Sequence, residues 1–187
     1  MNSEIDNNQS LKAPIAIRQI TQIALYTAAA VACGYLLIGL PNVELVSGIV
    51  ALSGLSLGSW SGALVGVFSE AIFSGLNPYG LPFPPVWAAQ MLGMAGTGFL
   101  FGKLRKLFDC SPPKTRIFIS VAGGIAGTLL FDLLTNLAFP IAMGVKTNAW
   151  GVYLLAALPF SAVHLAANAV VFAVIVPVAF DRLKARI

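Results

Sequence analysis

The sequence predicts an all-α integral membrane protein, a compact bundle of six transmembrane helices with both termini in the cytoplasm. Composition is the first reason: 58% of the 187 residues are hydrophobic and only 10% are charged, which excludes a disordered chain and suits one helical membrane domain. The second reason is that ten of the eleven Lys and Arg residues form three clusters between long apolar stretches, and cationic loops stay on the cytoplasmic side. These residues are Lys12 and Arg18, then Lys103, Arg105, Lys106, Lys114 and Arg116, and last Arg182, Lys184 and Arg186.

A membrane helix needs about 20 apolar residues, and about 17 are enough. Six segments reach or approach that length and run alternately outward and inward: 19–40, 43–57, 60–76, 86–102, 117–142 and 152–180. The second segment is short and an uncharged turn joins it to the third, so this part of the chain forms either two full spans or one re-entrant hairpin. The chain therefore divides into a cytoplasmic N-terminal tail (1–18), a membrane domain (19–181) and a basic cytoplasmic tail (182–187).

The positive charge does not indicate a nucleic-acid partner. The cations lie in short loops beside apolar spans and lack the aromatic and basic pattern of RNA-binding modules. They orient the chain in the lipid bilayer instead. Cys33 and Cys110 fall at different predicted depths, so we expect no disulfide between them.

Small residues recur at four-residue spacing, which places them on one face of a helix and lets helix backbones approach closely in a membrane. One such series crosses the second and third segments: Gly54, Gly58, Gly62 and Gly66. The first segment carries Ala24, Ala28 and Ala32. The alanines either pack against another helix of the same chain or form a docking surface for a second membrane subunit.

Two carboxylates lie inside predicted spans, where a charge is costly and tends to mark a binding site or pathway. Glu70 and Asp132 both fall in the outer half of the membrane, judged from the helical rise per residue. Other polar residues follow at helical spacing or lie near the same level: Asn77, Trp87, Gln90, Asn136, His164 and Asn168. They converge on one outward-facing cavity, or they hydrogen-bond one another and only hold the bundle together.

The predicted outer loops add further candidates. Residues 77–85 are rich in proline and aromatics, which gives a stiff segment that could close over a ligand at little entropic cost. The candidate substrate-binding residues are therefore Asn42, Glu44, Glu70, Asn77, Tyr79, Trp87, Gln90, Asp132, Asn136, Trp150, His164 and Asn168. Trp150 could equally be an ordinary anchor at the membrane interface.

Catalysis is a weaker hypothesis. His164 could bind a metal with Glu70 and Asp132, as in an intramembrane hydrolase. However, the sequence has a single histidine and no His-Glu-x-x-His pair. We therefore predict no catalytic residues, no metal and no cofactor. A small membrane scaffold protein of the cell-shape type is a second hypothesis, and an intramembrane enzyme is the third.

Four features together suggest a known family: the alanine stripe, Pro41-Asn42-Val43-Glu44, Asn77-Pro78-Tyr79-Gly80 and Gln90-Met91. From about residue 19 to 180 the chain resembles the substrate-binding (S) component of an energy-coupling factor (ECF) vitamin importer. Such a component is a multi-pass protein of the prokaryotic cell membrane. Its known members bind a vitamin or related micronutrient at the outer face and release it inward by toppling in the membrane.

The resemblance also implies partners and roles for particular residues. Two ABC-type ATPase subunits supply the energy through a transmembrane coupling (T) subunit, and Ala24, Ala28 and Ala32 would dock that subunit. The absence of a Walker motif agrees with this division of labour. The segments around Asn42 and Gln90 look most similar to members associated with cobalamin, although Glu44 stands where that subgroup would have Gln.

Overall fold

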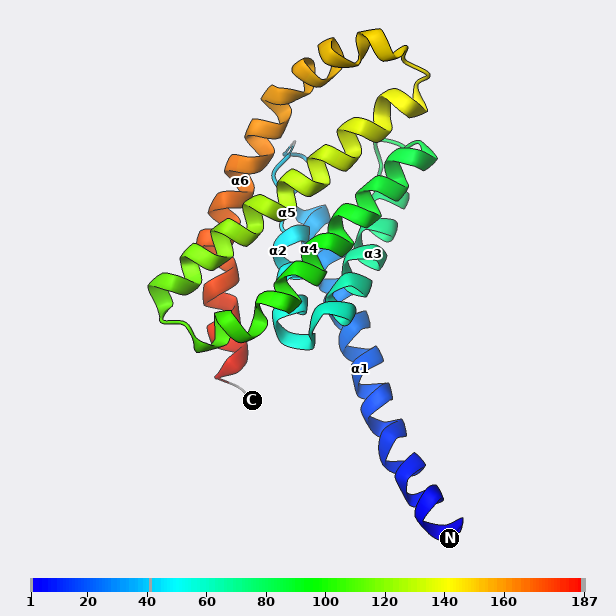
Figure 1. The fold of residues 1–187 in the computed structure, drawn as a ribbon, viewed down its shortest axis with the longest axis vertical. Helices are drawn as coiled ribbons and strands as arrows, with labels where there is room; N and C mark the ends of the chain where they lie inside the picture. Colours follow the sequence, from blue (N-terminus) through cyan, green and yellow to red (C-terminus); the bar gives the residue numbers. More distant parts are fainter. Residues whose placement is uncertain (1, 41, 186–187) are drawn as a thin grey trace.

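The computed structural model describes residues 2–40 and 42–185, with side chains from residue 16 onward. Pro41, Arg186 and the side chain of Lys12, all used in the predictions above, lie outside the described residues. The described chain is all-α, as predicted (Figure 1). Its helices are α1 (Asn2–Leu36), α2 (Val46–Leu57), α3 (Ser59–Gly75), α4 (Pro84–Cys110), α5 (Pro113–Ala142), the short 3-10 helix η1 (Thr147–Ala149) and α6 (Trp150–Lys184).

Each predicted segment coincides with one α-helix, but several helices run past the predicted ends. α1 begins at Asn2, well before residue 19, because hydropathy marks where an apolar stretch begins and not where the backbone stops being helical. By length and composition, two helical stretches could each cross a membrane, 113–142 and 147–184. The count of six spans and the cytoplasmic position of the termini remain predictions.

α2 is the central helix of the bundle. Nine of its twelve residues are buried, and it contacts all five other α-helices, with α5 the least. At 1.5 Å per residue, α2 is about 18 Å long, too short to cross a hydrocarbon core of about 30 Å. α2 and α3 form a hairpin of unequal arms, and the choice between two full spans and one re-entrant hairpin stays a prediction.

The glycine series brings three helices together at this hairpin. Gly58 forms the turn with φ = 93°, a conformation that favours glycine. Gly54 and Gly62 face each other across it: a Cβ on Gly62 would lie 2.6 Å from Gly54 Cα and 2.6 Å from the Gly98 carbonyl oxygen of α4. The prediction that these glycines allow close helix packing is confirmed.

We expect Gly62→Ala to destabilise the bundle by about 1–3 kcal/mol, because the added methyl group meets backbone atoms that cannot move aside. Thermal unfolding of the detergent-purified protein measures the effect. Gly151→Ala is the matched control, since no atom lies within 4 Å of a Cβ built there. Equal melting temperatures for the two variants would contradict the close approach.

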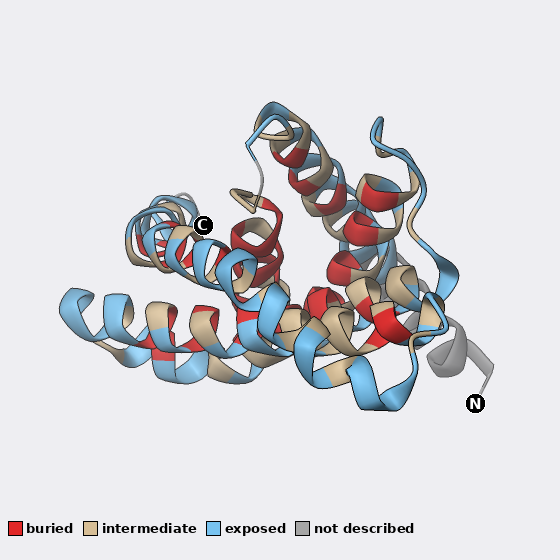
Figure 2. Cartoon of the chain, turned by 90° about the horizontal axis from the view of Figure 1, so that it is seen from above, coloured by how far each residue is buried: buried red, intermediate tan, exposed pale blue. Residues whose placement is uncertain are grey.

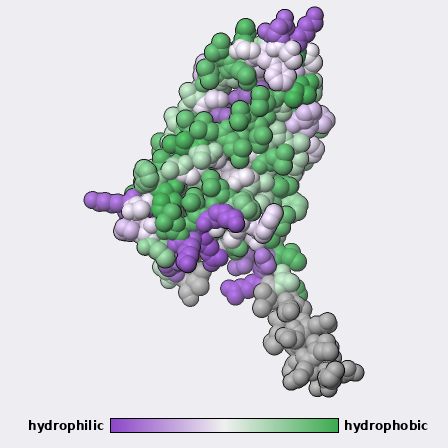
Figure 3. Space-filling view, viewed as in Figure 1, coloured by the Kyte–Doolittle hydropathy of each residue, from purple (hydrophilic) through white to green (hydrophobic). Residues whose placement is uncertain are grey.

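The buried apolar residues form two clusters, and the aromatic one lies at the end of the bundle that carries the described basic loops. Phe101 stacks on Phe172 with ring centroids 5.3 Å apart, and Phe108 meets Phe180 edge-on at 5.0 Å. Buried residues gather on the faces that the helices turn toward one another (Figure 2). The view in Figure 3 is mostly hydrophobic through its middle and hydrophilic toward both ends, as a membrane protein requires.

Ion pairs connect the α4–α5 turn to the end of α6. Arg116 Nη1 lies 2.5 Å from Asp181 Oδ1, and Lys184 pairs with Asp109. The hydrogen bond from Lys184 lowers the pKa of the Asp109 carboxyl below its usual value. Because these pairs are exposed, they contribute little to stability. They do place the second and third basic clusters at one end of the molecule, as the charge rule predicts for a cytoplasmic face.

Candidate functional site

A cavity of about 370 Å³ opens at the end of the bundle opposite the basic loops. Its walls come from α1, the non-helical segment 37–45, α3, α4, α5 and α6. Nine of the twelve predicted residues line it: Asn42, Glu44, Glu70, Asn77, Tyr79, Gln90, Asp132, Asn136 and His164. Residues far apart in the sequence therefore meet around one space, in which a ligand role for each remains a prediction.

The other three predicted residues do not line this cavity. Asn168 lies beneath it and is 1% exposed, because four residues along α6 move it one turn deeper than His164. The Trp87 ring packs against Gly75 of α3, where a Cβ would lie 3.0 Å from the ring. Trp150 Nε1 donates a hydrogen bond to the Val145 carbonyl at 3.0 Å and so closes the connection between α5 and α6.

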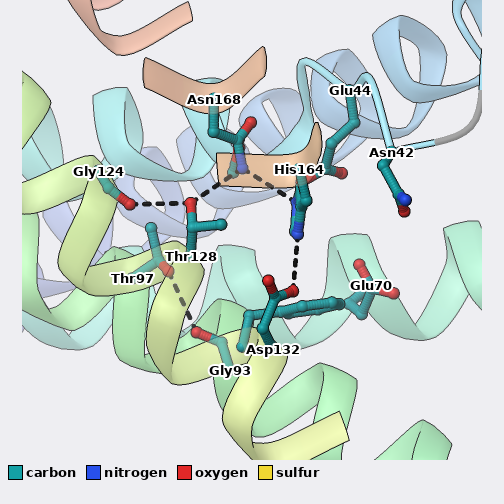
Figure 4. A network of polar contacts seen from close by, with 12 residues as sticks. Asn42, Glu44, Glu70, Gly93, Thr97, Gly124, Thr128, Asp132, His164 and Asn168 are labelled. Carbon is teal, nitrogen blue, oxygen red and sulfur yellow. Dashed lines mark hydrogen bonds and ion pairs between the residues drawn. The ribbon is translucent and has the colours of Figure 1, made fainter. Parts of the chain in front are cut away.

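His164 is the centre of the polar residues in this cavity (Figure 4). Its Nδ1 lies 2.7 Å from Asp132 Oδ1 on α5, and its Nε2 lies 3.0 Å from Asn168 Nδ2 on its own helix. On the Asn168 side, Ser47 Oγ of α2 donates to Asn168 Oδ1 at 3.2 Å. Three helices are thus joined by hydrogen bonds directly under the cavity.

The hydrogen bonds of Asn168 and Asp132 constrain the orientation of the His164 imidazole. Thr128 Oγ1 donates to the Gly124 carbonyl at 2.9 Å, so it accepts the hydrogen bond from Asn168 Nδ2 at 3.0 Å. The same amide nitrogen lies 3.0 Å from His164 Nε2. His164 Nδ1 carries a proton that Asp132 accepts, and the protonation of Nε2 depends on the orientation of the Asn168 amide and on Glu44, whose Oε1 lies 3.7 Å away.

The segment 37–45 carries Asn42 and Glu44 into the cavity. Asn42 has φ = 58°, a left-handed conformation that asparagine tolerates, and its Nδ2 donates to the Phe160 carbonyl of α6 at 3.3 Å. Glu44 Oε1 lies 3.7 Å from His164 Nε2. Non-helical backbone at membrane depth is tolerated where it lines a cavity inside the protein, which is the position of this segment.

Sequence reasoning missed the serine and threonine hydroxyls of the site. Ser74 donates a hydrogen bond to Glu70 one turn earlier on α3, and Asn136 Nδ2 donates to Ser161 Oγ at 3.3 Å. Hydroxyls in membrane helices usually bond their own backbone, so they gave no signal in the sequence. The four-residue spacing from Glu70 to Ser74 could have identified the first of these pairs.

Aromatic residues form much of the apolar part of the wall. Phe73, Phe131 and Phe160 all line the cavity, and the Phe131 ring meets the His164 ring edge-on with centroids 5.7 Å apart. Among the residues that the structure describes, no group of three His, Cys, Asp or Glu side chains is placed to hold a metal ion.

Comparison with known proteins identifies the family of this chain. Residues 18–176 match the family described as ECF transporter, substrate-specific component. The chain belongs to this family. No curated protein and no solved structure matched. As an ECF substrate-specific component it is a membrane transport protein and not an enzyme; components of this class bind a small-molecule substrate and associate with T and ATPase modules.

The alanine stripe of this ECF component faces outward. Ala24, Ala28 and Ala32 are exposed, whereas Ala30 on the other side of α1 is fully buried. The alternative in which the three alanines pack against a helix of the same chain is therefore wrong for the described residues. The stripe is a free surface of small residues.

Proposed function

We propose that this protein captures a vitamin or related micronutrient in the outward-facing cavity and delivers it inward while docked on an ATP-driven coupling module. The observation that carries the proposal is the cavity itself, which is lined by polar side chains from four helices and two connecting segments. A cavity of about 370 Å³ lies within the range of about 300–1,000 Å³ typical of small-molecule sites. The family match supplies the transport role.

The mouth of the cavity is formed partly by the segment between α3 and α4. Tyr79 lines the cavity and yet is 78% exposed, so it lies at the rim. Its backbone N–H donates to Asn77 Oδ1 at 2.9 Å, which stabilises the turn before Gly80. This segment acts as a lid that orders fully when a ligand contacts Tyr79.

Delivery uses a different face. The exposed stripe on α1 lets a helix of the coupling subunit approach the α1 backbone closely, as small residues do at membrane interfaces. Two ATPase subunits drive the coupling subunit, and the component topples so that the cavity opens inward. The likeness of the short segments around Asn42 and Gln90 makes cobalamin one candidate ligand. The cavity is near the small end of the usual range, so a corrin would fit only partly inside it.

Native mass spectrometry of the tagged protein, purified mildly from its host membrane, tests the proposal. We expect a retained small molecule of vitamin mass, or co-purifying coupling and ATPase subunits. A protein that emerges bare, stays bare when offered a vitamin panel and binds no subunits would contradict the proposal. That outcome would favour a membrane scaffold, and a change in cell shape after deletion would then be the next observation to seek.

A further inference from the structure

The cavity carries a marked excess of negative charge. Glu44, Glu70 and Asp132 reach it from three different elements, and none of the described residues that line it is a lysine or arginine. The formal charge of its ionisable groups is −3 with His164 neutral, and a protonated His164 would reduce it only to −2. Buried charges are costly unless they are paired, and the one described lining group that could pair with them is His164, 2.7 Å from Asp132 Oδ1 and 3.7 Å from Glu44 Oε1.

Two carboxylate oxygens in this wall have no hydrogen-bond partner although they are shielded from solvent. They are Glu44 Oε1 and Asp132 Oδ2, and the amide oxygen of Gln90 is a third such acceptor. They come from the segment 37–45, α5 and α4. Leaving a buried charged acceptor without a hydrogen bond costs more free energy than forming that hydrogen bond contributes to stability. A ligand with several N–H donors would satisfy all three at once.

The remaining wall suits the body of an organic cation. Phe73, Phe131 and Phe160 present aromatic surface to the same space, and Tyr79 closes its rim. The face of an aromatic ring attracts a cation, most strongly where water is excluded. Carboxylates on one side and aromatic rings on the other would hold a positively charged ring or amine between them.

Resting on the function proposed above, we propose that the substrate of this component is a compact organic cation with N–H donors, bound by Glu44 and Asp132 with Gln90 and the aromatic wall. Asp132 is held in place by His164, whose Nδ1 donates to its Oδ1 and leaves Oδ2 for the substrate. A carboxylate- or phosphate-bearing micronutrient would meet three carboxyl groups and, among the described lining residues, no lysine or arginine. Electrostatic complementarity of this kind selects the substrate by its charge.

The test uses the purified full-length protein, immobilised and exposed to yeast extract spiked with equal amounts of thiamine, pantothenate and cyanocobalamin. These additions represent a compact cation, a compact anion and a large corrin. After washing, bound compounds are released with solvent and identified by mass and by electrophoretic mobility at pH 7. We expect the retained compound to be a cation, whether thiamine or a component of the extract. Retention of pantothenate, cyanocobalamin or any other anionic or neutral compound overturns this proposal and leaves the transport function standing. Retention of nothing contradicts both.

Isosteric variants then test the residues. Glu44→Gln and Asp132→Asn remove charge and keep shape, so each should weaken binding of the retained cation roughly 10- to 100-fold, the usual effect of losing a charge-assisted hydrogen bond. Gln90→Glu makes the opposite change, since it adds a negative charge and keeps the shape. This variant should bind the cation as tightly as wild type or more tightly. Wild-type affinity in both Glu44→Gln and Asp132→Asn, or weaker binding by Gln90→Glu, would overturn the assignment.

Discussion

Ala28→Leu should abolish substrate uptake while leaving substrate binding unchanged. Ala28 is the middle residue of the exposed stripe Ala24, Ala28 and Ala32, and the cavity is lined from α1 only by Gly34, nearly two turns further along the helix. A leucine side chain on the stripe would hold a partner helix away from the α1 backbone, where close packing supplies most of the association energy. Uptake by cells that contain the complete importer, and co-purification of the coupling subunit, should both be lost.

The matched control for this prediction is Ala166→Leu. Ala166 is also exposed, on α6, a helix that does not contact α1. Its replacement by leucine adds the same volume and the same apolar surface at a position away from the stripe, so uptake should continue. Normal uptake by Ala28→Leu, or equal loss in both variants, would show that the stripe is not the docking surface.

The fold could be predicted largely from the sequence because two simple signals agree. Each apolar stretch predicted one helix. The basic clusters predicted the end of the molecule at which the α4–α5 turn meets the end of α6. The burial of α2 could not be predicted, because hydropathy treats a buried central helix and a lipid-facing one alike. In the structure α2 packs against all five other α-helices.

The candidate site was predictable where helical spacing carries the information. Asp132 with Asn136, and His164 with Asn168, share helix faces in the structure because four residues make about one turn. What spacing could not supply was contact between elements, such as the bond from Asp132 to His164 or the approach of Glu44 through the segment 37–45. Trp87 was misplaced because an aromatic residue near a helix end packs on a neighbouring glycine as readily as it lines a cavity.

The second large effect is expected for Asn168→Leu, which should destabilise the protein by roughly 2–4 kcal/mol and also weaken substrate binding. Asn168 is 1% exposed and bonds Ser47, Thr128 and His164, and interhelical hydrogen bonds in membranes contribute about 1 kcal/mol each. Leucine removes all three bonds and leaves Ser47 Oγ and His164 Nε2 without this buried partner. His164 would also lose the partner that holds its Nε2, so its ring could turn and Asp132 would no longer be fixed beneath the substrate.

Thermal unfolding in detergent, with and without the cation recovered from the extract experiment, separates these two effects. The control is Asn136→Leu, which makes the same chemical change one helix away and removes a single 3.3 Å hydrogen bond to Ser161. Its melting temperature should fall much less than that of Asn168→Leu. If Asn168→Leu melts like wild type, the buried hydrogen bonds do not hold the helices together. A displaced imidazole would leave Asp132 Oδ1 unpaired in the cavity wall and alter the charge that the cation meets. If Asn168→Leu is destabilised and still binds the cation with wild-type affinity, Asn168 stabilises the bundle without positioning His164.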